Sequence, residues 1–264
     1  MSEKISAKKL LEMKSSGEKI TSLTAYDASF AHILDELGIE VILVGDSLGM
    51  VLQGEQTTLD VSMEDMLYHT KIVSRSCPRS MLVADMPHRS YETPKQALEN
   101  ASRLIDESGA EVVKLEGGQD VADIVKHLSE NNIAVCGHVG LQPQSVEKYG
   151  GYKVQGRNES EAKQILDDAV ALEKAGAIMV VLECIPAELA KNITAAIKIP
   201  TIGIGAGADC DGQVLVIYDL LGISKRSPHM AKNFLAESDN IRDAVSNYIA
   251  AVKSVSFPAN EHSY

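Results

Sequence analysis

Short apolar runs alternate along the chain with longer segments in which apolar residues recur at helical spacing. The runs are rich in Val and Ile, and most of them lead into Gly, Pro, Asp or Ser. Such runs are typical of strands that are buried on both faces of a parallel sheet. The expected strands are residues 20–27, 41–47, 80–87, 111–118, 133–140, 177–186, 200–207 and, with a weaker pattern, 213–219.

The segments between the runs carry helix signals. Ser62 and Asp65 have the spacing of a capping box, in which each side chain satisfies the backbone of the other residue. Thr93-Pro94 places proline at the first position of a helix that stops at Gly109, and another helix is expected to end at Gly176. The expected helices are 62–76, Thr93 to Gly109, 158–174, 186–197 and 227–252.

Strands and helices in regular succession predict right-handed crossovers and a parallel sheet. About eight strands favour a single (β/α)8 TIM barrel over residues 1–264 rather than an open doubly wound sheet. The open sheet remains an alternative, because the segment between residues 207 and 213 is too short for a seventh helix. Residues 213–221 could themselves be that helix, which would leave the eighth strand unidentified. The polar stretch 141–157 predicts a long loop over one face.

Composition excludes several classes of protein. Of the 264 residues, 45% are hydrophobic and only 4% are aromatic, so aliphatic side chains must fill a large core. The net charge of −12 argues against binding to nucleic acid or to an anionic membrane surface. The four cysteines are far apart, which predicts free thiols rather than a zinc site or disulfides. The charged N-terminus does not look like a secretory signal and no run is long enough to span a membrane, so we expect a soluble cytoplasmic protein.

Polar and charged residues stand where the expected strands end. In a (β/α)8 barrel the loops after the carboxyl ends of the strands build the active site. A single Asp in such a place is commonly a helix cap or a turn residue, but a group of acids with a lysine and a histidine predicts an active site. The group consists of Tyr26, Asp27, Asp46, Ser47, Asp85, Lys114, Glu116, His138 and Glu183, followed by Gly203, Gly205 and Gly207.

Three of these acids indicate a metal site. Asp46, Asp85 and Glu116 offer hard oxygen ligands without thiolates, a set that suits Mg²⁺. A partly open Mg²⁺ can chelate a 2-oxo acid and make the neighbouring C–H acidic. Lys114, close to these acids, should stay cationic and could bind the substrate carboxylate, although it could also form an interior salt bridge.

Glu183 has a different setting. It follows the apolar run IMVVL, and such surroundings should raise the pKa of its carboxyl group toward neutral pH. This arrangement suits a general base that removes a proton from carbon. A fourth metal ligand and a structural carboxylate are the alternatives. The TIGIGAG run is a weak match to a phosphate-binding loop and indicates close approach or tight turns, and Cys136 is expected to be a core residue.

At these residues the sequence resembles the ketopantoate hydroxymethyltransferase family. The resemblance covers essentially the whole chain, and the GDSLGMV and GHVGL blocks are highly specific. It is carried by GDSLGMVLQGEQTTLDVSMEDMLYHT (45–70), VADMPHRSY (83–91), VKLEGG (113–118), GHVGLQPQSV (137–146), YKVQGR (152–157), ECIP (183–186), TIGIGAGADCDGQVLV (201–216) and EHSY (261–264).

The resemblance implies a (β/α)8 barrel of the phosphoenolpyruvate/pyruvate-type superfamily. It also implies transfer of a one-carbon unit from 5,10-methylenetetrahydrofolate to 3-methyl-2-oxobutanoate, giving 2-dehydropantoate on the route to pantothenate and coenzyme A. By this match Mg²⁺ would be bound by Asp46, Asp85 and Glu116, the oxo acid by Asp46, Ser47, Asp85 and Lys114, and the proton by Glu183. His138 matches a histidine near the substrate. The resemblance also implies a large homo-oligomer, often a decamer.

Two positions depart from the pattern of the family. His88-Arg89 stands where Phe-Gly is common, and Gln142 stands where Thr is common, so the contacts with folate are in doubt. The rival interpretations are another Mg²⁺-dependent 2-oxo acid lyase of the isocitrate lyase or phosphonopyruvate type, and a non-catalytic barrel that binds a metabolite. The lyases that cleave C–C bonds use a loop cysteine, whereas Cys136 here lies inside an expected strand.

Overall fold

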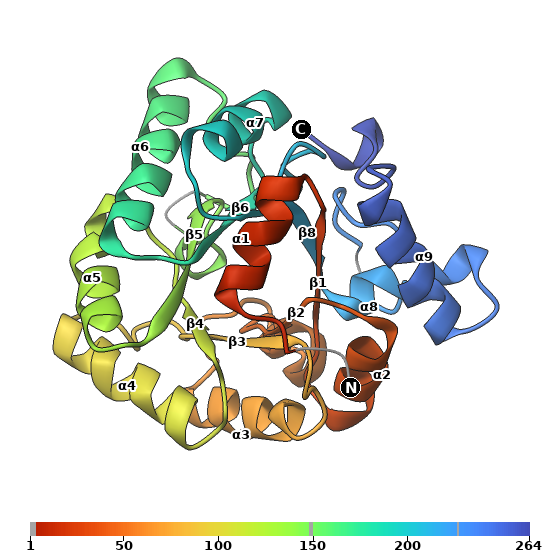
Figure 1. Cartoon of the computed structure of the whole chain (residues 1–264), viewed down its shortest axis with the longest axis horizontal. Helices are drawn as coiled ribbons and strands as arrows, with labels where there is room; N and C mark the ends of the chain where they lie inside the picture. The colour runs from red at the N-terminus through yellow and green to blue at the C-terminus, as the bar shows by residue number, and fades with distance from the viewer. Residues whose placement is uncertain (1–3, 148–149, 226) are drawn as a thin grey trace.

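The computed structural model describes residues 4–147, 150–225 and 227–264, and it confirms the predicted barrel (Figure 1). The strands are all parallel and close into a barrel in the order β1 to β8. They are β1 (Ile20–Thr24), β2 (Val41–Val44), β3 (Met81–Asp85), β4 (Val112–Lys114), β5 (Ala134–Gly140), β6 (Met179–Glu183), β7 (Thr201–Ile204) and β8 (Gly212–Leu215).

Most helices surround the barrel, while α1 lies across one end of it (Figure 1). The helices are α1 (Ala7–Ser16), α2 (Ala28–Leu37), α3 (Met63–Ser74), α4 (Pro94–Asp106), α5 (Ala122–Glu130), α6 (Glu159–Ala175), α7 (Ala187–Ala196), α8 (Ile217–Leu220) and α9 (Ile241–Lys253). Single turns are η1 (Gly49–Gln53), η2 (Gln119–Val121), η3 (Pro143–Ser145), η4 (Leu235–Glu237) and η5 (Asn260–His262).

The predicted helix starts are confirmed by their caps. Ser62 and Asp65 form the capping box of α3, and the Thr93 side chain accepts a hydrogen bond at the start of α4. Gly176 ends α6 in the left-handed region, with a φ of 102°. The prediction of a helix over 227–252 was wrong in its first half, because Asn240 caps α9 and the chain before it is irregular apart from η4. The sequence patterns did not indicate α1, α2 or α5.

The weak eighth run is divided between two elements. Its first part is β8, and its second part is the short helix α8. β8 pairs with both β7 and β1, which closes the barrel and makes the open-sheet alternative wrong. The direct connection between β7 and β8 explains why no seventh helix could be placed there. Residues 141–157 form the expected long loop, apart from η3 and from residues 148–149, which lie outside the described residues.

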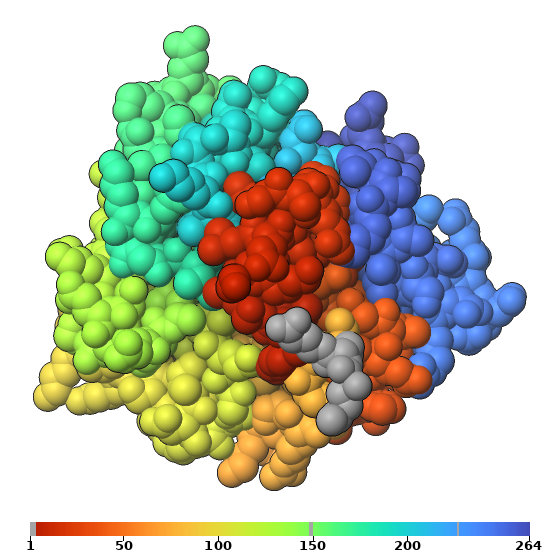
Figure 2. Space-filling view, in the orientation of Figure 1, coloured from red at the N-terminus to blue at the C-terminus, as the bar shows by residue number. Residues whose placement is uncertain are grey.

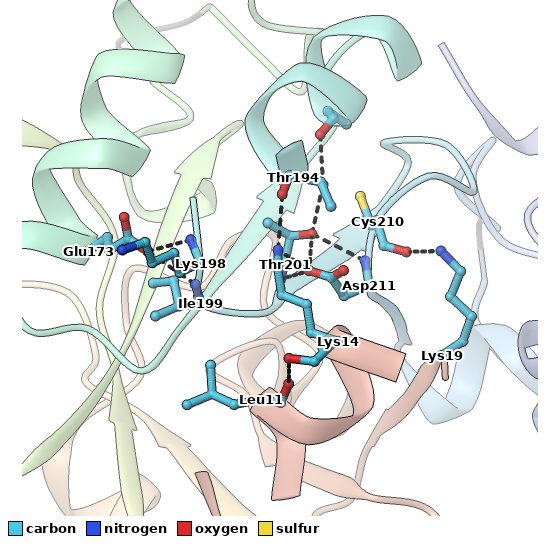
Figure 3. Close-up of polar contacts among 12 residues, drawn as sticks. Leu11, Lys14, Lys19, Glu173, Thr194, Lys198, Ile199, Thr201, Cys210 and Asp211 are labelled. Atoms are coloured by element: carbon cyan, nitrogen blue, oxygen red, sulfur yellow. Dashed lines mark hydrogen bonds and ion pairs between the residues drawn. The ribbon is translucent and has the colours of Figure 1, made fainter. Parts of the chain in front are cut away.

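Helix α1 closes the N-terminal end of the barrel. Ile5, Leu10 and Met13 are buried in one cluster with apolar side chains of all the strands, and Figure 2 shows α1 covering the centre of this face. Lys14 Nζ lies 2.7 Å from Asp211 Oδ2 and 3.0 Å from the Thr194 carbonyl oxygen (Figure 3). The same Asp211 oxygen also accepts from Thr201, so α1 is fixed to the barrel by a connected polar network.

The four cysteines are free thiols and all are buried, as predicted. In the described part of the chain, every helix is too short or too polar to cross a bilayer.

Candidate active site

Every second residue of a barrel strand faces the barrel interior, and at one end of the barrel these inward positions are polar. Side chains of a parallel strand alternate between the two faces of the sheet. In β3 the inward series Met81 and Val83 belongs to the interior cluster, and the next residue in this series is Asp85. In β6 the series Met179 and Val181 leads in the same way to Glu183. Apolar layers therefore support a polar layer at the carboxyl ends of the strands.

The other strands extend the same layer. Lys114 follows Val112 in β4, and His138 follows Cys136 in β5. The register pairs Asp85 with Lys114 across β3 and β4. Lys114 is 5% exposed and His138 is 2% exposed, so both would be unusual inside a barrel unless partners were present.

The Gly-Asp-Ser turn after β2 fits around Asp85. The Asp46 N–H donates to Asp85 Oδ2 at 3.0 Å. A Cβ atom on Gly45 would lie 2.7 Å from Ser47 Oγ and 3.5 Å from Asp85 Oδ2, so a larger residue at position 45 would crowd the turn. Ser47 Oγ lies 2.8 Å from the hydroxyl of Tyr26. The turn thus brings Asp46 and Ser47 into the polar layer.

Lys114 and Asp85 form a buried ion pair. Their Nζ and Oδ1 atoms are 2.7 Å apart. Burial alone would lower the pKa of Lys114, but the carboxylates of Asp85, Glu116 and Asp46 raise it above its usual value. Lys114 therefore stays cationic, as predicted, and the interior salt bridge that was the alternative is also present.

Gln144 joins two of the acids, and the sequence patterns did not indicate it. Its side-chain amide donates to Asp46 Oδ2 at 2.8 Å, while its backbone N–H donates to Glu116 Oε2 at 2.9 Å. The Tyr91 hydroxyl donates to the side-chain oxygen of Gln144 at 2.6 Å, which fixes the orientation of the amide. Gln144 lies in the GHVGLQPQSV block, but an irregular polar loop has no periodicity that could indicate which side chain points inward.

His138 lies between two carboxylates. Its Nδ1 is 3.6 Å from Glu116 Oε1, and its Nε2 is 3.1 Å from Glu183 Oε2. The second separation is short enough for a hydrogen bond, but neither ring nitrogen of His138 has a hydrogen-bond partner among the described residues. Burial lowers the pKa of His138, and the nearby Lys114 lowers it further, against the opposing effect of Glu183. The surroundings of Glu183 are therefore less apolar than its sequence indicated.

The polar layer contains more negative than positive charge. Asp46, Asp85 and Glu116 are buried acids that face the ammonium of Lys114, so full ionisation of these four groups leaves an excess of two negative charges before Glu183 is counted. Burial and the neighbouring Asp85 raise the pKa of Asp46 to about 7. Burial and Asp46 raise the pKa of Glu116 well above its usual value. Mutual repulsion is thus built into the cluster.

These residues fit a divalent cation by charge and by donor chemistry. Glu116 Oε1 is buried, and it accepts no hydrogen bond from the described part of the chain. Mg²⁺ prefers oxygen ligands and is commonly bound by one or two carboxylates together with water or substrate oxygens. However, in residues 4–147, 150–225 and 227–264 no three Asp, Glu, His or Cys side chains are gathered so that they could hold a metal ion together. The acids instead accept hydrogen bonds from Lys114, Gln144 and the Asp46 backbone.

Some residues at the strand ends have structural roles. Asp27 caps α2, where its side chain accepts from the backbone of Ser29 and Phe30. Cys136 is buried in the barrel interior, as expected for a core residue. Gly205 and Gly207 adopt positive φ angles of 61° and 81° where the chain turns after β7, which agrees with the expected tight turns.

Residues 4–260 match the family model described as ketopantoate hydroxymethyltransferase. The 3-methyl-2-oxobutanoate hydroxymethyltransferase of Nitrosococcus oceani is 56% identical over 257 residues, which are 97% of this chain and 97% of that protein. The protein of the same name from Methylococcus capsulatus is 54% identical over 264 residues, which are 100% of this chain and 98% of the relative.

Two solved structures with the same fold are far less similar in sequence. Phosphonopyruvate hydrolase in complex with oxalate and Mg²⁺ superposes with a TM-score of 0.63 at 12% identity, covering 97% of this chain and 92% of the other. The structure of 2,3-dimethylmalate lyase, described as a member of the PEP mutase/isocitrate lyase superfamily, has a TM-score of 0.59 at 17% identity and covers 82% of each chain. Identities this low show the fold alone, and the fold is the one predicted.

Proposed function

Since the chain belongs to the ketopantoate hydroxymethyltransferase family, we propose that it transfers the one-carbon unit of 5,10-methylenetetrahydrofolate to 3-methyl-2-oxobutanoate. The product is 2-dehydropantoate, a precursor of pantothenate. The observation that carries the proposal is one buried layer of acids, lysine and histidine at the mouth of the barrel, in a chain that matches this family from residue 4 to residue 260. We place the reaction in the cytoplasm, and we expect the chain to act as a homodecamer.

Lys114 and Ser47 are the groups we assign to the oxo acid. Lys114 is a permanent cation at the floor of the mouth, so it attracts the carboxylate of the substrate. Ser47 is held by Tyr26 and can donate a hydrogen bond to a substrate oxygen. Burial and the neighbouring Asp85 raise the pKa of Asp46, so a further positive partner beside it would stabilise its charged form.

We assign that partner to Mg²⁺ held by Asp46, Asp85 and Glu116. The support is the excess negative charge, the buried Glu116 oxygen that lacks a donor among the described residues, and the fold-related phosphonopyruvate hydrolase, which was crystallised with oxalate and Mg²⁺. Oxalate, like a 2-oxo acid, offers two adjacent oxygens. When bound, the cation polarises the keto group and so makes the C3 proton more acidic.

Glu183 is the base in this proposal. Its carboxylate is 12% exposed, so it can meet a substrate at the mouth while lying mostly out of water. His138 Nε2 lies 3.1 Å from Glu183 Oε2. Glu183 takes the C3 proton, and the electron pair left at C3 forms the new C–C bond to the methylene carbon of the co-substrate. Both C–N bonds of that carbon break and one water supplies the product hydroxyl. Tetrahydrofolate leaves with one hydrogen on each of the two nitrogens, which balances the C3 proton and the second hydrogen of the water.

Hydrogen exchange at C3 tests the separate parts of this proposal. The protein is incubated with 3-methyl-2-oxobutanoate in D₂O, and loss of the C3 proton is followed by NMR. Exchange should require Mg²⁺ but no folate, whereas formation of 2-dehydropantoate should require both. If EDTA leaves exchange unchanged, the metal assignment is wrong. If neither exchange nor transfer occurs with Mg²⁺ and folate present, the function is wrong, and substrates of the related lyases become the next to test.

A further inference from the structure

Two exposed side chains meet above the polar layer. Met50 lies in the π-helical turn η1, three residues after Ser47, and is 38% exposed. Tyr152 lies in the loop between β5 and α6 and is 52% exposed. The Tyr152 hydroxyl donates to Met50 Sδ at 3.5 Å, so loops that follow two distant strands touch each other. Turns of the π type are rare and occur frequently at functional sites.

The loop that carries Tyr152 reaches from the β2 side of the mouth to the β6 side. At its far end the Gln155 N–H donates to the carbonyl oxygen of Cys184 at 2.9 Å, directly after Glu183. Partial burial raises the pKa of Tyr152, and the carboxylates of Glu183, Asp46 and Glu116 raise it further. The chain around Tyr152 is held at Met50, three residues after Ser47, and at Cys184, directly after Glu183, so this half-exposed tyrosine lies between the loops that carry a proposed metal ligand and the proposed base.

The other space near these acids does not reach the base. A cavity of about 450 Å³ borders the cluster on the side of Glu116 and Gln144, and its wall includes His88, Arg89 and Gln142. None of the residues that line it belongs to β6. A molecule in this cavity would contact Glu116 and Gln144, whereas Glu183, beside which the reacting carbon of the oxo acid must lie, is not part of its wall.

We propose that Tyr152 and Met50 form the platform on which the flat pterin ring of methylenetetrahydrofolate stacks. This inference rests on the proposed function, which requires a second substrate above the oxo acid. The co-substrate must bring its methylene carbon to C3 beside Glu183, and Tyr152 is an exposed ring held between the loops that follow Ser47 and Glu183. A tyrosine ring gives a rigid stacking surface, and a methionine adapts to the edge of a heteroaromatic ring.

Removing the ring tests the platform by separating the two substrates. Tyr152→Ala should raise the KM for methylenetetrahydrofolate about tenfold, the size of effect seen when a stacking aromatic is truncated. C3 exchange of the oxo acid in D₂O, which needs no folate, should stay within about twofold of the wild-type rate. Tyr152→Phe should behave like wild type, because the ring and not the hydroxyl is used. Tyr68→Ala is the matched control, because Tyr68 is 65% exposed on α3.

A direct binding measurement does not depend on catalysis. The chain has no tryptophan, so Tyr152→Trp introduces a single tryptophan whose fluorescence can be followed. Adding tetrahydrofolate should change the emission of Tyr152→Trp in a saturable way, while Tyr68→Trp corrects for absorption of light by the ligand.

Three results would contradict the proposed platform. The first is an unchanged KM for methylenetetrahydrofolate in Tyr152→Ala. The second is a loss of C3 exchange in the same variant, which would place Tyr152 on the oxo acid, and the third is the same emission change in Tyr152→Trp and Tyr68→Trp. Failure of the proposed function is distinct from these results, because it would appear as a wild-type protein that neither exchanges C3 nor forms product.

Discussion

Buried acids at the two ends of the barrel differ in how well their charges are paired. At the N-terminal end, Asp211 accepts from Lys14 and from Thr201, and Glu40 accepts from Thr21 and from Lys253. Each of these acids has a cationic partner and backbone or hydroxyl donors. At the mouth, three acids share Lys114, and both ring nitrogens of His138 lack a well-formed hydrogen bond within the described residues.

This difference separates the part of the barrel that stabilises the fold from the part that is arranged for ligands. Satisfied networks at the N-terminal face fix α1 to the barrel, and this face of (β/α)8 barrels contributes stability. Unsatisfied groups and repulsion at the mouth are costs that a bound ligand can remove. Substitutions at the mouth should therefore change activity more than stability, and substitutions at the N-terminal end should do the reverse.

The largest effect is expected at the proposed base. Glu183→Gln keeps the shape of the side chain but cannot accept the proton, so C3 exchange should fall by roughly 10²- to 10⁴-fold. The binding of the oxo acid should stay within about tenfold, and the free energy of unfolding should change little. Exchange is measured by NMR in D₂O, and unfolding by urea titration. Glu188→Gln, on the exposed side of α7, is the control, and an unaltered exchange rate in Glu183→Gln would remove Glu183 as the base.

The second-largest effect is expected at the N-terminal end of the barrel, on stability. Asp211→Asn leaves Lys14 largely buried without a carboxylate, which should lower the free energy of unfolding by about 3 kcal/mol. At a temperature where the variant is folded, its C3 exchange rate should equal that of wild type. Glu12→Gln is the matched control, because Glu12 pairs with Lys8 at 3.8 Å on the exposed side of α1 and should change nothing measurable. Undiminished stability in Asp211→Asn would show that this network is not what fixes α1.

The site was more predictable from the sequence than the N-terminal end. Asp85 and Glu183 follow buried runs, and parallel strands bring their carboxyl ends together, so their convergence followed from the order of elements. Helix α1 carries lysines on a short amphipathic stretch, and nothing local indicates that Leu10 and Met13 would cover the barrel. Its position depends on contacts with β-strands far along the chain, such as those near Asp211.

Two further features depended on tertiary structure. Gln144 was not predicted as a site residue because an irregular polar loop has no hydrophobic periodicity. Its role follows from contacts with Asp46 and Glu116 in other loops. The helix expected from residue 227 begins at Ile241 instead, where Asn240 supplies the cap. The caps at Ser62 and Thr93 were predicted correctly, whereas the caps at Asp27 and Asn240 and the contacts across the fold were not.

The smallest effect is expected at Glu116, and it should be stabilising. Glu116→Gln removes one of three buried negative charges, while its side-chain oxygen can still accept from the Gln144 N–H. With EDTA at pH 8, above the pKa of about 7 of Asp46, the free energy of unfolding should rise by about 1 kcal/mol because repulsion between positions 46 and 116 is lost. Mg²⁺ should stabilise the wild type by mass action and stabilise Glu116→Gln less.

Urea titrations with EDTA and with Mg²⁺ measure both quantities, and Glu130→Gln, which removes a carboxylate from the exposed ion pair of α5, is the control. If Glu116→Gln unfolds more easily in EDTA, Glu116 is stabilising in the way that Asp211 is, and the contrast between the two ends of the barrel is wrong. If Mg²⁺ stabilises the variant as much as the wild type, Glu116 does not bind the metal, and the negative charge at the mouth must be compensated by another ligand. A Glu116→Gln protein that is more stable than wild type in EDTA, and that Mg²⁺ no longer stabilises, would show that the acids at the mouth repel one another without metal. It would also show that a bound cation removes this repulsion.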